Sequence, residues 1–209
     1  RAIADFGADV PFGQVAPKMK EHYGIDLAAC APRLLTERVA RELTEADCLP
    51  AARPSHVANW LIVETDGGMV PIVETLAGAA DARKGKTTRW REAKVCIAQR
   101  QGEVVPKAGV TMDGPTEAGA ILKRLAEALG FNAKTQVHGV GDGATWIGDQ
   151  IEEQFGAQGG FLIDLFHVCD YLTPASVVCA PDSPKDWVAS QKARLLAGQA
   201  GEVVAEMKP

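Results

Sequence analysis

The first part of the chain places its apolar residues with the period of an α-helix. Val15, Met19 and Tyr23 stand four residues apart, and Gly24 follows them where a C-terminal cap is usual. Asp26 is a suitable N-cap for the next helical stretch. Two helices joined by a short turn predict either a helix-turn-helix or a plain helical hairpin, and the sequence leaves both open.

From residue 57 the pattern changes to the alternation typical of strands. A first apolar run ends in Asp66, the pair Gly67–Gly68 indicates a turn, and a second run follows, so we expect a hairpin. A longer alternating run after it predicts one long strand or a bent pair. The predicted strands span residues 57–66, 69–78 and 89–105.

Helices and strands alternate in the second half of the chain. Strands joined by short turns should be antiparallel, and strands that alternate with helices should be parallel to the first one. The sequence therefore predicts an α/β fold with a mixed sheet and helices on its faces. The predicted elements are a helix at 114–130, a strand at 134–143, a helix at 145–156, a strand at 159–166 and a helical remainder broken at Pro174 and between Pro181 and Pro184.

Composition indicates a globular chain and limits its partners. The 209 residues are 46% hydrophobic and 23% charged, with a net charge of −5, so overall charge gives nucleic-acid binding no support. Five cysteines without a C-x-x-C pair indicate reduced thiols in the cytosol, and no apolar run is long enough to cross a membrane. Because the chain begins at Arg1 and stops after a helical run, we expect a piece of a longer protein.

The glycine-rich stretch at 138–150 surrounds the carboxylate of Asp142 with glycines. Its glycine spacing fits neither a dinucleotide-binding fingerprint nor a P-loop, and the carboxylate would repel a phosphate. Asp142 follows a strand and precedes a helix, which is the sheet edge where sites gather in α/β folds. It either presents its carboxylate at that edge or simply caps the next helix.

Asp66 offers a second carboxylate at the same predicted edge. If its strand is a parallel neighbour of the strand before Asp142, both side chains emerge together; otherwise Asp66 is a turn aspartate. Paired carboxylates suit Mg²⁺ or Mn²⁺, which fill their remaining positions with water and substrate phosphate. Two such ions can hold both the attacking and the leaving oxygen of a phosphoryl transfer.

Four motifs in this order resemble bacterial insertion-sequence transposases of the DDE type, which have an RNase H-like catalytic core. They are the strand around Asp66, WREAK at 90–94, GDGATWI at 141–147 and the D-x-x-H strand end at Asp164 and His167. The likeness covers about residues 57–209. It implies an RNase H-like mixed sheet and a reaction that cuts DNA and transfers the cut strand during transposition.

The resemblance also implies roles for individual residues. Asp66 would be the first catalytic and metal-binding acid and Asp142 the second, with two Mg²⁺ or Mn²⁺ ions expected in the full-length protein. A third acid, a glutamate in an SG-x-VE motif on a later helix, is implied, but the sequence contains no such motif. Glu202 and Glu206 lie in a stretch that looks like the helical insertion preceding it, so neither is assigned as the third acid.

The expected domain organisation follows from these patterns and from the likeness. It comprises a helical, helix-turn-helix-like region at 1–46, a proline-containing linker at 47–56, the RNase H-like core at 57–172 and the start of a helical insertion at 173–209. The expected location is the bacterial cytoplasm.

Asp164 and His167 end the last predicted strand, close to the expected metal-binding edge. One interpretation gives them a supporting role, in which they orient the residues of the site by hydrogen bonds. In the other, Asp164 caps the following helix and His167 makes a local hydrogen bond.

Residues 83–100 carry seven basic side chains and one acidic one. This local excess favours contact with a DNA backbone, although a solvated edge strand would carry similar charges. Trp90 and Trp146 either stack on a flipped base or pack in a core. The candidate DNA-binding side chains are Arg89, Arg91 and Lys94.

The expected function is therefore that of part of a DNA transposase. Its partners would be transposon ends and target DNA, with a homo-oligomer also expected and no membrane. Two alternatives stay open, an RNase H-like nuclease and a non-catalytic DNA-binding remnant of a transposase. For this chain alone we expect weak metal binding and little activity.

Overall fold

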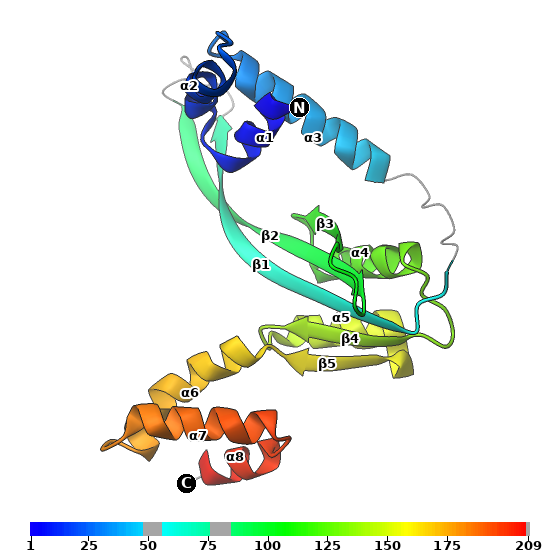
Figure 1. Cartoon of the computed structure of the whole chain (residues 1–209), viewed down its shortest axis with the longest axis vertical. Coiled ribbons are helices and arrows are strands. Elements are labelled where there is room, and N and C mark those ends of the chain that lie inside the picture. Colours follow the sequence, from blue (N-terminus) through cyan, green and yellow to red (C-terminus); the bar gives the residue numbers. More distant parts are fainter. Residues whose placement is uncertain (48–55, 76–84, 208–209) are drawn as a thin grey trace. The chain divides into compact units, whose positions relative to one another are not determined.

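The computed structural model of the chain describes residues 1–47, 56–75 and 85–207 (Figure 1). The chain divides into two compact units, Arg1–Ala52 and Arg53–Pro209. The predicted linker at 47–56 lies mostly outside the described residues, and the division between the units falls within it.

The described part of the first unit contains three helices, α1 (Ala2–Asp9), α2 (Phe12–Tyr23) and α3 (Ala31–Asp47). Val15 and Met19 of α2 are buried, and Gly24 ends that helix in the left-handed conformation, as the sequence predicts.

The prediction that Asp26 caps the next helix is wrong. Helix α3 begins only at Ala31, and the carboxylate of Asp26 instead pairs with Lys20 Nζ at 2.9 Å. Residues 24–30 therefore form a longer connection than the short turn of a helix-turn-helix.

The second unit is built on a five-stranded sheet in the order β3-β2-β1-β4-β5. Strand β2 is antiparallel to both β1 and β3, whereas β4 is parallel to β1 and β5 is parallel to β4. The predicted mixed α/β sheet is thus confirmed. The strands are β1 (Trp60–Thr75), β2 (Lys86–Arg100), β3 (Lys107–Thr111), β4 (Gln136–Gly141) and β5 (Gly159–Ile163).

The predicted hairpin at Gly67–Gly68 is wrong, because β1 runs through both glycines without turning. A Cβ atom at Gly67 would collide with Oε1 of Glu92, so this glycine makes room for a side chain of the neighbouring strand. The two predicted strands at 57–66 and 69–78 are consequently one strand. The predicted strand at 89–105 corresponds to β2, whereas β3 lies beyond its predicted end and was not predicted.

Two helices cover one face of the sheet and close the core. Helix α4 (Pro115–Ala128) packs on β1, β2 and β3, and helix α5 (Thr145–Phe155) packs on β4 and β5. The side chains that alternate toward these helices are buried, while Val95, Val110 and Leu162 on the opposite face are exposed. The sheet residues of the core, with one residue just before β1, are Ala58, Leu61, Val63, Cys96, Ala98 and Val137.

A short 3-10 helix, η1 (Gly156–Gln158), joins α5 to β5, and three more helices follow the sheet. They are α6 (Leu165–Cys179), α7 (Pro184–Leu196) and α8 (Ala200–Met207). The predicted break at Pro174 is wrong, since α6 continues through it, and α6 also crosses the predicted domain boundary at 172. No helix in the described part of the chain has the length and apolar character needed to cross a membrane.

Strands β1 and β2 extend past the rest of the sheet. Strand β4 pairs with β1 only over residues 60–64, and β3 pairs with β2 only over 94–98. Residues 67–75 and 86–93 therefore pair only with each other, apart from Gly67 opposite Lys94, and Figure 1 shows the two strands continuing together beyond β3 and β4. We call this two-stranded extension the β1–β2 ribbon.

Candidate active site at the sheet edge

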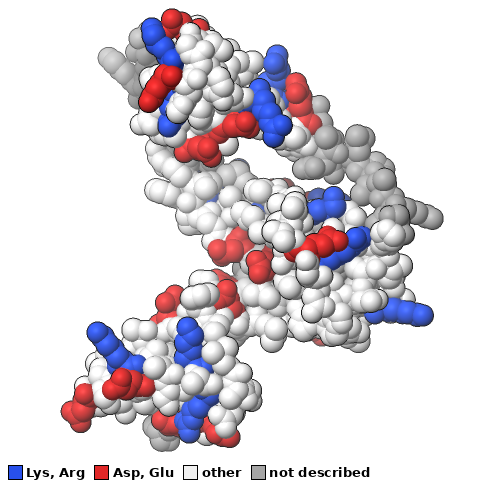
Figure 2. All heavy atoms as spheres, in the orientation of Figure 1, with Lys and Arg blue, Asp and Glu red and all other residues white. Residues whose placement is uncertain are grey.

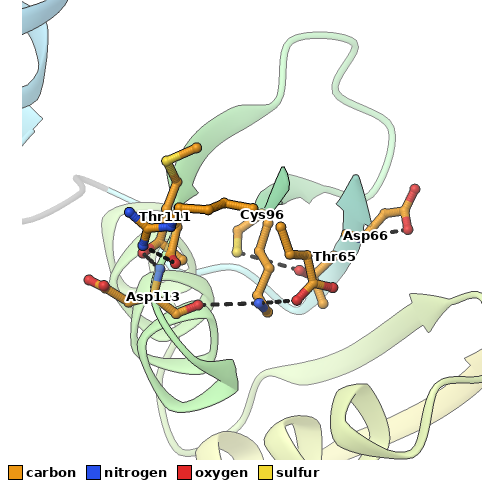
Figure 3. Close-up of polar contacts among 10 residues, drawn as sticks. Thr65, Asp66, Cys96, Thr111 and Asp113 are labelled. Atoms are coloured by element: carbon orange, nitrogen blue, oxygen red, sulfur yellow. Dashed lines mark hydrogen bonds and ion pairs between the residues drawn. The ribbon is translucent and has the colours of Figure 1, made fainter. Parts of the chain in front are cut away.

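The register of the two central parallel strands brings Asp66 and Asp142 to one edge. Glu64 and Val140 form the last aligned pair between β1 and β4, and each aspartate lies two residues further along its chain. Thr65 points into the core, so Asp66 faces the opposite side, as Figure 3 shows. Asp66 does not end its strand as predicted, but it lies where β1 separates from β4.

An open cavity of about 200 Å³ lies at this edge. The four acidic or histidine residues singled out in the sequence, Asp66, Asp142, Asp164 and His167, all line it. Its remaining lining residues are Glu64, Thr65, Val95, Ile97, Val140 and Gly141. Side chains from β1, β2 and β4, from the turn after β4 and from the start of α6 thus surround one small space.

Each of the two central carboxylates uses one oxygen for a local hydrogen bond. Oδ1 of Asp66 accepts from the Gly67 amide at 2.7 Å, and Oδ1 of Asp142 accepts from the Ala144 amide at 2.8 Å. Among the described residues, no hydrogen bond or ion pair engages the second oxygen of either side chain. Each aspartate therefore keeps one carboxylate oxygen for a ligand.

The turn after β4 presents Asp142 without using it as a helix cap. Ala144 occupies the N-cap position of α5, which has no side-chain cap hydrogen bond. Gly143 has a φ of 96°, a conformation that favours glycine, and this residue makes the sharp turn. Gly141 leaves no space for a substrate, because a Cβ atom there would lie 2.8 Å from Cδ1 of Ile147.

Asp164 does act as the N-cap of α6, as one of the two interpretations expected. Its Oδ1 accepts from the Phe166 amide at 2.6 Å, and its own amide donates to the Gly141 carbonyl at 2.8 Å. This pair of bonds ties the start of α6 to the end of β4. His167, one turn of helix away, is exposed and lines the cavity.

The carboxylate oxygens at this edge are the kind of ligand that a hard divalent cation prefers, but too few of the described side chains provide them. Carboxylate oxygens are the ligands that Mg²⁺ and Mn²⁺ prefer. Within the described ranges, however, no three His, Cys, Asp or Glu side chains lie close enough together to hold a metal ion. The edge therefore provides two well-placed carboxylates, Asp66 and Asp142, and not a complete set of protein ligands.

Glu206 is engaged elsewhere, which agrees with leaving it out of the site. Its carboxylate pairs with Arg194 and accepts hydrogen bonds from Trp187 Nε1 and Gln191 Nε2, both at 3.1 Å. The Arg194 guanidinium, followed by the Trp187 hydrogen bond, holds the pKa of Glu206 below its usual value. This cluster joins α8 to α7.

The three candidate DNA-binding residues do not share one environment. Arg89 and Arg91 are exposed on the β1–β2 ribbon, where Arg89 lies 3.8 Å from Glu74. Lys94 is only 4% exposed, and its Nζ donates to Glu92 Oε2 at 2.5 Å and to a backbone carbonyl of the β3–α4 loop at 3.2 Å. The prediction that Lys94 contacts DNA is therefore wrong, because a buried and paired ammonium has no access to a phosphate.

The two candidate tryptophans also differ. Trp90 is 60% exposed on the β1–β2 ribbon, whereas Trp146 packs against the core, with Lys94 Nζ 5.7 Å from its ring centre. Of the two interpretations, Trp146 follows the core one. On the face drawn in Figure 2, acidic and basic side chains are interspersed, and the described residues form no continuous basic surface there.

The sequence reasoning missed Glu64, which lines the cavity from β1. The signal was available, because side chains two positions apart in a strand point to the same face, and Glu64 precedes Asp66 by two residues.

A further residue next to the site, Cys96, is fully buried beneath it. Its Sγ lies 3.5 Å from the Thr65 hydroxyl, and Figure 3 draws this contact. Burial raises the pKa of this thiol, so it remains neutral and structural.

Comparison with known proteins adds no family to this description. Neither the protein-family models nor the curated proteins contain a match to this chain. Support for a function therefore comes from the sequence motifs and from the geometry of the sheet edge.

Proposed function

We propose that this chain is part of a DNA transposase of the DDE type, in which Asp66 and Asp142 are the first two catalytic acids. The observation that carries the proposal is their position. Two carboxylates from neighbouring parallel strands line one cavity, and each has a free oxygen among the described contacts. The same two residues stand in the motifs that resemble such transposases.

The topology of the sheet supports an RNase H-like core. That fold has three antiparallel strands followed by strands that alternate with helices, with the first strand in the middle of the sheet. The order β3-β2-β1-β4-β5 has this form, and the helix α4 separates β3 from β4. Acids at the ends of the two central parallel strands then lie at the edge where sites gather.

The chemistry proposed for this edge is metal-dependent phosphoryl transfer. Bound Mg²⁺ or Mn²⁺ would supply charge stabilisation for the phosphate and activation of the attacking oxygen. Asp66 and Asp142 would hold the cation through their free oxygens. Asp164 would act as a positioning residue, because its two hydrogen bonds fix the start of α6 against the end of β4.

Calorimetric titration with Mn²⁺ tests the site directly. We expect the wild-type chain to bind weakly, and the double variant Asp66→Ala/Asp142→Ala to bind no Mn²⁺. Asp149→Ala is the matched control, because it removes an exposed carboxylate of α5 that does not line the cavity. Equal Mn²⁺ binding by the double variant and the wild type would refute the site assignment.

A non-catalytic DNA-binding remnant is the second candidate, and one observation favours it. The described residues bring no third ligand to the two carboxylates. The two candidates differ in a simple assay, in which a supercoiled plasmid is incubated with the chain and Mn²⁺. Nicking that is lost in Asp142→Ala supports the transposase, and DNA binding without nicking supports the remnant.

A further inference from the structure

The β1–β2 ribbon has two chemically different faces. Opposite pairs of the ladder share a face, so Pro71 and Trp90 lie on one side together with Met69 and Val73. All four of these side chains are exposed, with Met69 at 58% and Val73 and Trp90 at 60%. One face of the ribbon is therefore an apolar surface centred on a tryptophan.

The other face of the ribbon carries positive charge. Arg89 and Arg91 alternate with Trp90 and so point to the opposite side. Arg89 lies 3.8 Å from Glu74, whose side chain is 44% exposed, and Arg91 Nη2 donates to the Met112 carbonyl at 3.3 Å. On the apolar side, Glu92 is neutralised by Lys94. The ribbon as a whole therefore keeps a local excess of positive charge.

The free edge of β1 is poorly suited to accept another strand. The Gln101 amide donates to the Trp60 carbonyl, so these two residues form a hydrogen-bonded pair of the β1–β2 ladder. Hydrogen-bonded and non-hydrogen-bonded pairs alternate along an antiparallel ladder, which makes Pro71 a non-hydrogen-bonded position whose nitrogen faces away from β2. Proline has no amide proton there to offer a partner strand. The side chains, and not the backbone edge, are thus the part of the ribbon available for binding.

We infer that the β1–β2 ribbon enters between two DNA strands, with Trp90 stacked on an unpaired base and Arg89 and Arg91 against the phosphates of the opposite strand. The occupant follows from complementarity, because an apolar aromatic face suits bases and a basic face suits phosphates. This inference rests on the proposed function, since DNA must be the substrate of the adjacent site.

The position of the ribbon fixes where the unpaired base would lie. Trp90 is opposite Pro71, which follows Asp66 by five residues on the same strand. At the rise of a β-strand this is roughly 17 Å along the ribbon. The repeat of about 3.4 Å per nucleotide then places the stacked base about five nucleotides from the phosphate at the acid pair.

Fluorescence anisotropy with the full chain tests the inference. The probes are a blunt duplex and a forked duplex of equal length. Each of the two unpaired arms of the fork is about five nucleotides long, which matches the spacing between Trp90 and the acid pair. We expect the wild type to bind the fork about tenfold more tightly than the blunt duplex, which is the scale of one base–aromatic stack. Trp90→Ala should abolish this preference, Trp90→Phe should retain most of it, and the control Tyr171→Ala, which removes another exposed aromatic residue, should leave it unchanged.

A second readout locates the base. With 2-aminopurine at each arm position in turn, stacking on Trp90 should quench the fluorescence at one position near the fifth nucleotide, and Trp90→Ala should remove the quenching. If Trp90→Ala keeps the fork preference while the wild type binds DNA, the inference falls and the proposed function stands. If the wild type binds neither probe, both fall. Self-association that disappears in Trp90→Ala, with DNA binding unchanged, would identify the apolar face as a contact between copies and overturn the inference.

Discussion

Thr135 links three strands at the edge opposite the candidate site. Its hydroxyl donates to the Ala58 carbonyl at 2.6 Å, just before β1, and accepts from the Asn132 backbone amide and from Asn132 Nδ2, both at 3.0 Å. Gln158, just before β5, donates to the Thr135 carbonyl at 2.6 Å. Thr135 is fully buried immediately before β4, so water cannot take the place of these hydrogen-bond partners.

Thr135→Val should destabilise the chain, because the isosteric side chain leaves a buried carbonyl and two N–H donors without a partner. We expect a loss of about 1–3 kcal/mol in the free energy of unfolding, measured by urea denaturation. Thr173→Val is the control. The Thr173 hydroxyl is exposed and bonds only the Cys169 carbonyl one turn earlier in α6, so its loss should change stability by less than about 0.5 kcal/mol. Equal losses in both variants would show that the buried network contributes no more than an ordinary surface hydroxyl.

The two central acids could be identified from the sequence, whereas the environment of Lys94 was misjudged. Asp66 and Asp142 each follow an apolar run, and chain order predicted that the two strands would be parallel. Whether they are neighbours was left open, and the structure pairs them directly. Lys94 was grouped with Arg89 and Arg91 by charge. Strand alternation places Lys94 on the same face as Cys96, which is buried in the core, and this face is closed by α4.

At the scale of elements, the close packing of β4 on α5 explains why the stretch before Asp142 is rich in glycine. A Cβ atom at Gly139 would lie 2.6 Å from Cγ1 of Ile151, and a Cβ atom at Gly141 would meet Ile147 in the same way. These glycines allow the helix to approach the strand. Their function is packing, which the sequence reasoning did not distinguish from binding.

Gly139→Ala should therefore destabilise the second unit by about 1–3 kcal/mol, the usual cost of inserting a methyl group into a filled core. Gly160→Ala is the matched control on the neighbouring strand β5. Gly160 faces open space, with nothing within 4 Å of the position that a Cβ atom would take, so its substitution should be nearly neutral. Urea denaturation of both variants checks the difference, and equal midpoints would contradict the packing argument.

The helices and strands that alternate in the second half of the chain were predictable, whereas the leading strands were not. Helices α4 and α5 and strands β4 and β5 lie within their predicted ranges, because each has a clear period and a glycine or proline at or near its boundary. The Gly67–Gly68 pair misled, since a glycine that accommodates a neighbouring side chain looks like a turn glycine in the sequence. Strand β3 was missed, because it is only five residues long and lies between the predicted strand at 89–105 and the predicted helix at 114–130.

The cluster around Glu206 makes the contact between α7 and α8 sensitive to pH. The pKa of Glu206 is lowered in the folded chain by Arg194, so its ionised form stabilises this contact. That contribution is present above the usual value of 4.5 and is lost as the pH falls through the lowered folded pKa. Arg194→Gln should shift the pKa of Glu206 back toward its usual value, as NMR titration of the carboxyl carbon would report. Lys192→Gln on the same helix is the control, and an unchanged pKa in Arg194→Gln would contradict the assignment.

At the scale of the whole molecule, the core of the sheet is built from one continuous part of the chain. All members of the buried cluster lie between Ala58 and Phe155. Among the described residues, none of the first unit contributes to it. The residues that line the candidate site also come only from the second unit.

A chain consisting of Arg53–Pro209 should therefore fold and keep the site. Its core and its cavity lining are complete without the three N-terminal helices, so we expect its thermal midpoint to lie within roughly 2 °C of the corresponding transition in the full chain. Its Mn²⁺ affinity should equal that of the full chain, and Asp66→Ala/Asp142→Ala should abolish binding in both. Calorimetry measures both quantities on the same samples. A fragment that loses its cooperative transition would show that the first unit stabilises the sheet, whereas a fragment that folds but no longer binds Mn²⁺ would show that the first unit supplies a ligand to the site.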